Sequence, residues 1–167
     1  MVSTDELRIA IAGHALLGDL QPHHIAMLAA LAHRTQFLPG DIIFREGEHG
    51  NWFYFLISGE VELELTASGQ PLPVQELRFG QEFGWSSLFE ESKGFEKSTR
   101  HFTARALTRV DALAFDGSEL RLAFRQDPEF GYRFMRRLLA VATERLDAAR
   151  LELSRCNQLK TNTPAPN

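Results

Sequence analysis

Residues suited to binding a phosphate group gather in the middle of the chain. The segment Gly80–Phe89 contains two glycines and carries two neighbouring hydroxyl side chains, Ser86 and Ser87. Arg100 follows after a charged loop, at the start of the next expected strand. A phosphate is bound by free backbone N–H groups at the start of a helical turn and by a guanidinium. We therefore expect an anion-binding site formed by this segment and Arg100.

The histidines and other reactive side chains do not form a catalytic or metal-binding pattern. His33, His49 and His101 are isolated, and the neighbours His23 and His24 are expected to point in different directions near a helix start. A zinc or iron site needs several such side chains converging on one point. The sequence also lacks the nucleophile elbow and the glycine-rich fingerprints of common enzymes. We predict a protein that is not an enzyme and has no metal site.

The composition is that of an ordinary globular protein. The chain has 167 residues, a formal net charge of −4 and one cysteine, Cys156. A single cysteine excludes a disulfide within the chain, and the negative charge argues against non-specific nucleic-acid binding. No apolar run reaches the roughly 18 residues of a membrane span, and no secretory signal is visible. These features predict a cytoplasmic protein with no membrane partner.

The secondary structure expected around the anion site changes from helix to strand and then back to helix along the chain. Ser3 with Glu6 fits a capping box, and Pro22 suits the first position of a second helix. Short β-type runs separated by glycine-containing turns follow, which predicts a β-roll or jelly roll, before helices return. We expect one α+β domain over residues 1–160. Its N-terminal helices, β-roll, C-terminal helices and disordered tail are expected over residues 1–36, 37–116, 117–160 and 161–167.

Two runs in the β region show how its strands should face the core. Phe53–Ile57 is apolar at every position, which predicts a strand buried on both faces. Val61–Leu65 alternates apolar and acidic residues, which predicts apolar side chains facing inward and carboxylates facing outward.

A long helix is expected from Asp127 to about Leu159, with two apolar seams. One seam includes Phe134 and Leu138 and should dock on the β-roll. The second repeats with heptad spacing, which is typical of a helix that pairs with a partner helix. The alternative is one wide stripe facing the core of a single chain. The expected homodimer interface consists of Met135, Leu139, Ala142, Leu146, Ala149 and Leu153.

This arrangement resembles the cyclic-nucleotide-binding domain, the family of catabolite-activator-like effector domains and of the regulatory subunits of cyclic-AMP-dependent kinases. Phe37–Gly47 is similar to the family's strand–turn–strand opening, and Phe53–Val61 is similar to the strand pair that follows. Gly80–Phe89 lies where the family carries its phosphate-binding cassette. The resemblance covers about residues 14–155.

The resemblance implies roles for individual residues. In the family, a short helix and an arginine hold the cyclic phosphate, and a glutamate holds the ribose 2′-hydroxyl. Gly84 matches the cassette glycine and Arg100 the arginine, but Trp85 stands at the place of the glutamate, and the loop Glu90–Thr99 is longer than in typical relatives. The expected ligand-binding residues are Gly84, Trp85, Ser86, Ser87, Arg100, His101 and Phe102.

Two of the functions implied by the resemblance involve a nucleotide. The first is an accessory subunit with a modified pocket that docks as a dimer on a larger redox enzyme. Small stand-alone members of this family accompany the NAD-reducing soluble hydrogenases of bacteria and are associated with an NADPH response. Trp85 would stack on a base, and the loss of the glutamate would remove a clash with a 2′-phosphate. The second function is an ordinary cyclic AMP or cyclic GMP sensor acting through a partner protein.

The third function is a ligand-free interaction module in which the cassette is only structural. Arg100 would then pair with Glu82, Glu90 or Glu91. DNA-binding relatives carry a winged helix-turn-helix after the long helix, and this sequence shows none. We therefore expect no direct contact with DNA under any of the three functions.

Overall fold

The computed structural model of the chain describes residue 5 and residues 8–9, 17–67, 69–89 and 99–161. The predicted capping box at Ser3 and Glu6, most of the predicted long loop, and the tail beyond Thr161 lie outside these residues.

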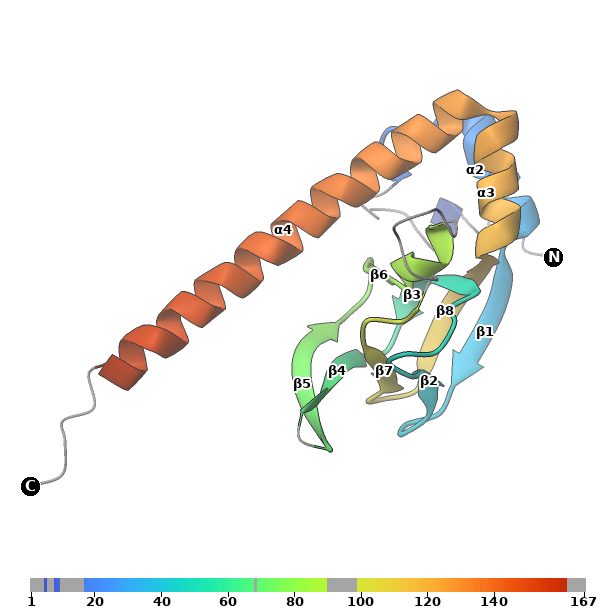
Figure 1. The fold of residues 1–167 in the computed structure, drawn as a ribbon. Helices are drawn as coiled ribbons and strands as arrows, with labels where there is room; N and C mark the ends of the chain where they lie inside the picture. Colours follow the sequence, from blue (N-terminus) through green and yellow to red (C-terminus); the bar gives the residue numbers. More distant parts are fainter. Residues whose placement is uncertain (1–4, 6–7, 10–16, 68, 90–98, 162–167) are drawn as a thin grey trace, which may run out of the picture.

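Two four-stranded antiparallel sheets form the body of the molecule, as predicted for a β-roll (Figure 1). The first sheet has the order β1-β8-β3-β6, with bounds His33–Phe37, Val110–Asp116, Trp52–Ser58 and Glu82–Phe83. The second has the order β2-β7-β4-β5, with bounds Ile42–Phe44, Thr103–Ala106, Val61–Ala67 and Gln70–Leu77. The first strand begins four residues earlier than the predicted boundary at residue 37. Its side chains are mostly exposed, so only pairing with β8 identifies it as a strand.

Strand β3 separates two apolar cores, which confirms the prediction that it is buried on both faces. Side chains alternate between the faces of a strand. Phe53 and Phe55 therefore point into one core, which β3 shares with the helices, while Tyr54 and Leu56 point into the other, between the two sheets. The continuous apolar run is thus explained by a central strand with no solvent-facing side.

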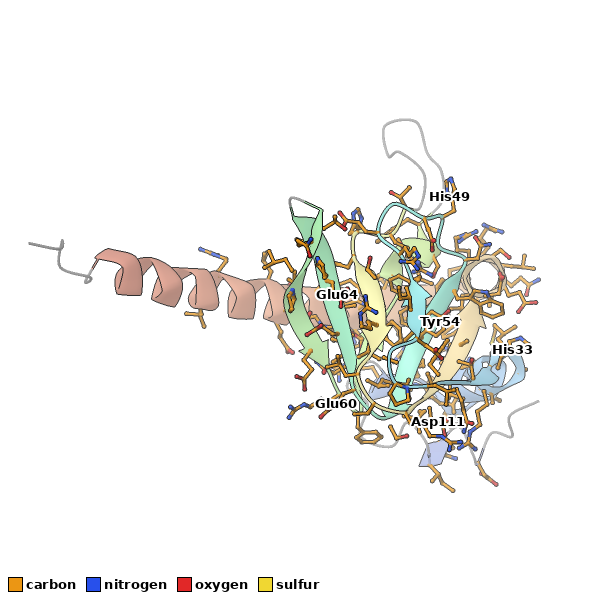
Figure 2. The ribbon with its side chains drawn as sticks, turned by 90° about the horizontal axis from the view of Figure 1, so that it is seen from below. His33, His49, Tyr54, Glu60, Glu64 and Asp111 are labelled. Atoms are coloured by element: carbon orange, nitrogen blue, oxygen red, sulfur yellow. The ribbon has the colours of Figure 1, made fainter. Side chains whose placement is uncertain are left out.

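Strand β4 departs from the predicted pattern at one position. Val61 and Leu63 are buried as expected, but Glu64 is also buried, with 5% of its surface exposed. Its carboxylate accepts a hydrogen bond at 2.7 Å from Arg105 Nε on the neighbouring strand β7 (Figure 2). The prediction that this carboxylate faces solvent is wrong, because a cross-strand arginine compensates its charge.

Three helices cover one end of the roll: α2 (Pro22–Leu31), α3 (Gly117–Gln126) and α4 (Pro128–Thr161) (Figure 1). Pro22 is the first residue of α2, and the carboxylate of Asp116 accepts hydrogen bonds from the backbone N–H groups of Ser118 and Glu119, as expected for a capped helix. Phe134 and Leu138 anchor the first half of α4 in the core. Its second half extends away from the roll (Figure 1).

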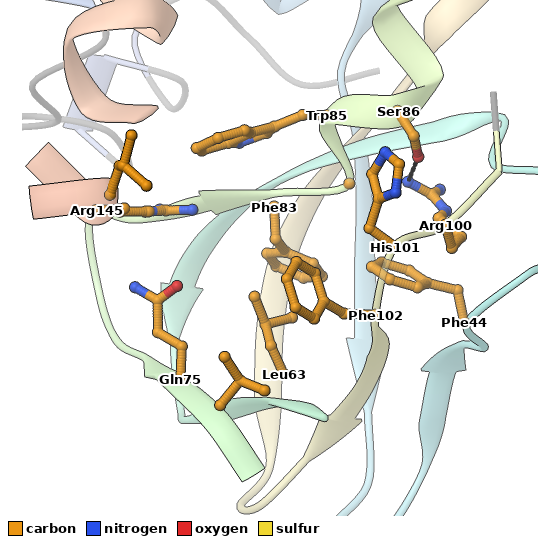
Figure 3. Close-up of a pocket in the computed structure, with 13 residues that line it drawn as sticks. Phe44, Leu63, Gln75, Phe83, Trp85, Ser86, Arg100, His101, Phe102 and Arg145 are labelled. Carbon is orange, nitrogen blue, oxygen red and sulfur yellow. Dashed lines mark hydrogen bonds between the residues drawn. The ribbon is translucent and has the colours of Figure 1, made fainter. Parts of the chain in front are cut away.

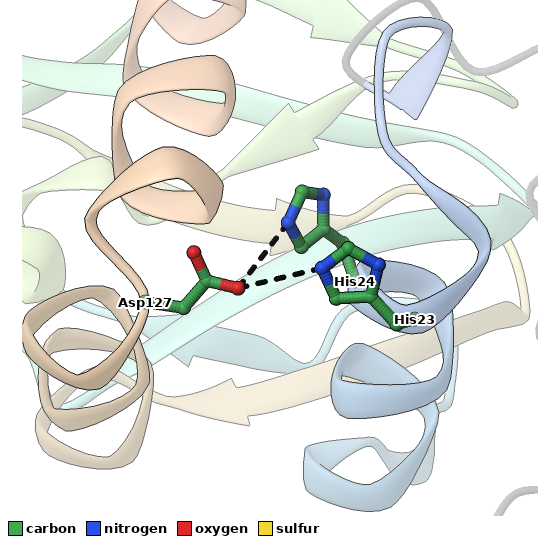
Figure 4. A group of neighbouring side chains, drawn as sticks. All are labelled: His23, His24 and Asp127. Carbon is green, nitrogen blue, oxygen red and sulfur yellow. Dashed lines mark ion pairs between the residues drawn. The ribbon is translucent and has the colours of Figure 1, made fainter.

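His23 and His24 converge on Asp127 instead of pointing in different directions (Figure 4). Their Nε2 atoms lie 3.5 and 3.3 Å from Asp127 Oδ2. His24 is fully buried, and its Nδ1 accepts a hydrogen bond of 3.1 Å from the backbone N–H of Gln21, which closes the capping box of α2. A neutral imidazole that accepts at Nδ1 carries its proton at Nε2. The proton therefore lies on the side of Asp127, although Nε2 makes no hydrogen bond there, and a ring nitrogen that carries a proton cannot ligate a metal.

Acid should destabilise the protein through His24. Burial lowers the pKa of His24, because a charged ring is poorly solvated there and a proton on Nδ1 would break the capping box. An unfolded histidine has a pKa of about 6.5, so neutral His24 makes its whole contribution to the free energy of unfolding above that pH. The free energy of unfolding decreases as the pH falls below 6.5, by at most about 1.4 kcal/mol per pH unit.

The test compares free energies of urea unfolding at pH 7.5 and pH 5 in the wild type and in His24→Asn. Asparagine keeps an acceptor near Gln21 and does not titrate. The difference in the free energy of unfolding between pH 7.5 and pH 5 should therefore be smaller in His24→Asn than in the wild type. His33→Asn, at an exposed position, is the matched control. An unchanged pH dependence in His24→Asn would contradict this assignment.

Candidate functional site

The predicted cassette folds as strand β6 followed by a single 3₁₀ turn, η2 (Trp85–Leu88). Gly84 joins them with a φ of 84°, in the left-handed region. A Cβ atom on Gly84 would lie 2.6 Å from the carbonyl oxygen of Trp52 and 2.8 Å from Arg100 Nη1. Glycine is therefore required here both for its conformation and for the close approach of the arginine.

Arg100 reaches the cassette from the residues just before β7. It is 4% exposed. Its Nη1 donates to Ser86 Oγ at 3.2 Å and its Nη2 donates to the carbonyl oxygen of Trp52 at 2.6 Å, while the guanidinium lies 4.1 Å from the centre of the Phe44 ring. Gly50 makes room for it, because a Cβ atom there would lie 2.2 Å from Arg100 Nε.

The charge of Arg100 is uncompensated in the part of the chain that the structure describes. No carboxylate there forms an ion pair with it, and its Nε has no hydrogen-bond partner. Burial lowers the pKa of Arg100 to about 10, so the guanidinium remains a cation at neutral pH. A buried cation without a counter-charge is costly and attracts an anion.

A cavity of about 250 Å³ lies beside Arg100, between the second sheet, the cassette and helix α4 (Figure 3). Most of its wall is apolar or aromatic, and no carboxylate is among the described residues that line it. These residues are Phe44, Leu63, Val74, Gln75, Phe83, Gly84, Trp85, Ser86, Arg100, His101, Phe102, Arg145 and Leu146.

Six of the seven predicted ligand-binding residues line this cavity, and Ser87 does not. The Ser87 hydroxyl donates to the carbonyl oxygen of Gly84 at 2.9 Å. Its own carbonyl oxygen accepts a hydrogen bond from Arg121 and lies where a Cβ atom on Gly117 would stand. Consecutive residues of a 3₁₀ turn point in directions roughly 120° apart. Ser87 therefore contacts α3 while Ser86 faces Arg100.

A second arginine, Arg145 of α4, closes the opposite end of the cavity. Its Nη2 donates to the carbonyl oxygen and to Oε1 of Glu82, both at 2.9 Å, and its guanidinium lies 4.7 Å from the centre of the Trp85 ring. The Glu82 side chain is 2% exposed. Burial raises the pKa of Glu82 and lowers the pKa of Arg145, while each charge opposes the shift of the other.

One sequence prediction is corrected by this pair. Glu82 pairs with Arg145, so it is not the partner of Arg100, and the other two proposed partners, Glu90 and Glu91, lie outside the described residues. The expected stacking of Trp85 on a base stays a prediction, and one face of its ring carries the guanidinium of Arg145.

Sequence reasoning missed Arg145, although a signal for it exists. Arg145 follows Leu138 by two helical turns and so continues the apolar seam that docks on the roll. A charged residue within such a seam indicates a buried ion pair or a binding site. Phe44, Leu63, Val74, Gln75 and Phe83 were also missed, since strands distant in sequence bring them to the cavity.

The predicted heptad seam of α4 has different surroundings along its length. Leu139 and Leu146 are exposed at 68% and 60%, and Tyr132 at 66%. Met135 packs against the core instead, because the core-facing stripe of the helix is wide enough to include it. Ala142 is half-buried, and the side chains of Ala149 and Leu153 lie outside the described part. No helix in the described ranges combines the length and the apolar character needed to cross a membrane.

The family model of the cyclic nucleotide-binding domain matches residues 34–127. A CRP-like cAMP-activated global transcriptional regulator of Mycobacterium tuberculosis is 28% identical over 126 residues, which cover 75% of this chain and 54% of that protein. A cAMP-dependent protein kinase regulatory subunit of Emericella nidulans is 34% identical over 95 residues, covering 57% of this chain and 21% of that protein. This chain thus spans about half or less of the length of these curated relatives.

Solved structures share the fold over nearly the whole chain. A cyclic nucleotide-binding domain from Methylobacillus flagellatus KT superposes with a TM-score of 0.73 and covers 98% of this chain and 85% of its own, at 16% identity. The antiparallel roll with flanking helices is therefore the fold of these proteins.

Proposed function

This chain belongs to the cyclic nucleotide-binding domain family, and we propose that it is a non-catalytic regulatory subunit that binds the phosphate of a nucleotide at Arg100. One observation carries the proposal: Arg100 is buried beside the cavity without an ion-pair partner in the described residues. A phosphate would supply the missing charge.

Calorimetry with cyclic AMP, cyclic GMP, NADPH and NADH tests the proposal. We expect at least one of them to bind with a 1:1 stoichiometry per chain, and we expect phosphate-free adenosine not to compete with it. Absence of heat with all four nucleotides, at concentrations up to the millimolar range, would contradict nucleotide binding.

The nucleotide we favour carries an additional phosphate, as NADPH does. The absence of a carboxylate among the described residues that line the cavity supports this choice, because no lining carboxylate repels a second anion. In this proposal the protein docks on a larger cytoplasmic redox enzyme, an NAD-reducing hydrogenase, and transmits NADPH binding to it. Co-purification with the hydrogenase subunits and a change in hydrogenase activity on adding NADPH would support this setting.

An ordinary cyclic AMP or cyclic GMP sensor is the second candidate. The cAMP-dependent names of the two curated relatives favour it. In the same calorimetric series, tight binding of cyclic AMP without binding of NADPH would select this function.

A homodimer formed through α4 is part of the proposal. The exposed side chains of Leu139 and Leu146 lie seven residues apart, two turns of the same helix, and support a partner helix on this face. The third candidate, a ligand-free interaction module, uses the same surface. It differs from the other two in predicting assembly that is insensitive to every nucleotide.

Leu146→Asp should dissociate this dimer, because a carboxylate in a helix–helix seam is buried without a partner. Light scattering coupled to size exclusion should then show the mass of one chain, where the wild type shows two. Leu122→Asp, at an exposed leucine of α3, is the matched control and should leave the mass unchanged. A Leu146→Asp protein that remains dimeric would contradict the proposed interface.

A further inference from the structure

The cavity has donor groups at both ends. Arg100 lies at one end, and Arg145 with Trp85 lies at the other, with the rings of Phe83 and Phe102 between them (Figure 3). Arg100 Nε, Arg145 Nε and Trp85 Nε1 are all buried and have no hydrogen-bond partner. These three atoms have almost no accessible surface, and Arg100 Nε lies against Gly50, so a ligand in the cavity would reach Arg145 through Nη1.

Arg145 is held so that part of its guanidinium remains available. Arg145 donates to Glu82 through Nη2, and no hydrogen bond from Arg145 Nη1 or Nε is found in the described ranges. Glu82 itself does not line the cavity. The carboxylate therefore orients the guanidinium from behind, and the Trp85 ring covers one of its faces.

The cavity offers few acceptors to such donors. Of the described lining residues, Gln75, Ser86 and His101 carry side-chain acceptors, and Ser86 Oγ already accepts from Arg100. An acceptor for Arg145 Nη1 and a counter-charge for Arg100 would then come from the ligand. A guanidinium that is stacked on an indole ring and has Nη1 available matches the oxygens of a second phosphate.

We propose that Arg145 and Trp85 determine specificity by recognising a second phosphate, so that the ligand is a nucleotide with two separated phosphate groups, one at Arg100 and one at Arg145. This inference rests on the proposed function, because it assigns the end of the same cavity opposite Arg100. The buried Glu82 is compatible with a second anion. Its carboxyl group already has a raised pKa and can take up a proton as the phosphate engages Arg145.

Adenosine 2′,5′-bisphosphate and 5′-AMP are suitable probes, because they differ only in the second phosphate. We expect calorimetry to show the bisphosphate binding at least tenfold tighter than AMP. The double variant Glu82→Gln with Arg145→Gln removes both charges of the pair. In it, the ratio of the bisphosphate affinity to the AMP affinity should fall to about one, while the AMP affinity stays within about twofold of the wild type.

Two further variants isolate the contributing groups. Trp85→Phe keeps an aromatic ring under Arg145, so the ratio of the two affinities should stay within about twofold of the wild-type value. Arg136→Gln removes an arginine of the same helix that pairs with Asp19 on the surface, and the ratio should be unchanged. Circular dichroism of each variant verifies its fold.

Equal affinity for the two probes in the wild type would overturn the inference while leaving phosphate binding at Arg100 intact. An unchanged ratio of the two probe affinities in the double variant would also overturn the inference. Failure of both probes and of all other nucleotides to bind would instead contradict the proposed function itself, so the two failures are distinguishable.

Discussion

Arg100→Gln is expected to weaken nucleotide binding by roughly 2–5 kcal/mol, which is about 30-fold to several thousand-fold in the dissociation constant. The reason is the burial of the guanidinium. Water cannot replace the pair it forms with phosphate, so the ligand anion would be left with neutral neighbours. Calorimetry with whichever nucleotide binds the wild type measures the loss.

The stability of the unliganded protein should respond differently. Arg100 has no counter-charge among the described residues, so removing it also removes a desolvation cost. Glutamine retains one donor for the carbonyl oxygen of Trp52, and we expect the melting temperature to stay within about 3 °C of the wild type, equivalent to roughly 1 kcal/mol.

The matched control for Arg100→Gln is Arg109→Gln, in the exposed turn before β8. It changes the net charge equally and should leave the affinity unchanged. If Arg100→Gln binds nucleotide as well as this control does, Arg100 is not the phosphate residue. A large loss of stability without loss of affinity would assign it a purely structural role.

Arg145→Ala is expected to destabilise the protein by about 3 kcal/mol, because it removes the arginine that pairs with the buried Glu82 carboxylate. Protonation of that carboxyl limits the loss, since its pKa is already raised by burial. The melting temperature should fall by roughly 6–12 °C. Chemical unfolding at pH 7.5 measures the free energy directly.

Glu82→Gln in the Arg145→Ala background should recover most of that stability, because it removes the buried charge. The sign of the pH dependence provides an independent check. A raised pKa in the folded state means that the folded protein binds the extra proton, so Arg145→Ala should lose less stability at pH 5 than at pH 7.5. Full stability of Arg145→Ala at pH 7.5 would show that the pair contributes little.

Local chemistry was sufficient to predict much of this molecule. The continuous apolar run Phe53–Ile57 favours a strand without a solvent face, and Pro22 marks a helix start wherever that helix packs. Gly84 and Arg100 were predicted as parts of an anion site from the residue types of the segment and from its resemblance to the family's cassette. These features depend on backbone conformation and side-chain type over a few neighbouring residues.

Tertiary structure alone decided which charges are buried and which side of the cassette faces the cavity. The sequence pattern placed Glu64 in solvent and Ser87 in the site. Arg105 from the adjacent strand and the close packing of α3 reversed both assignments. Arg145 joined the site only because α4 passes beside the cavity, and Arg145 lies 56 residues after Phe89, the end of the cassette (145 − 89). The free energy of a charge depends on its surroundings in three dimensions, and spacing along the chain does not encode those surroundings.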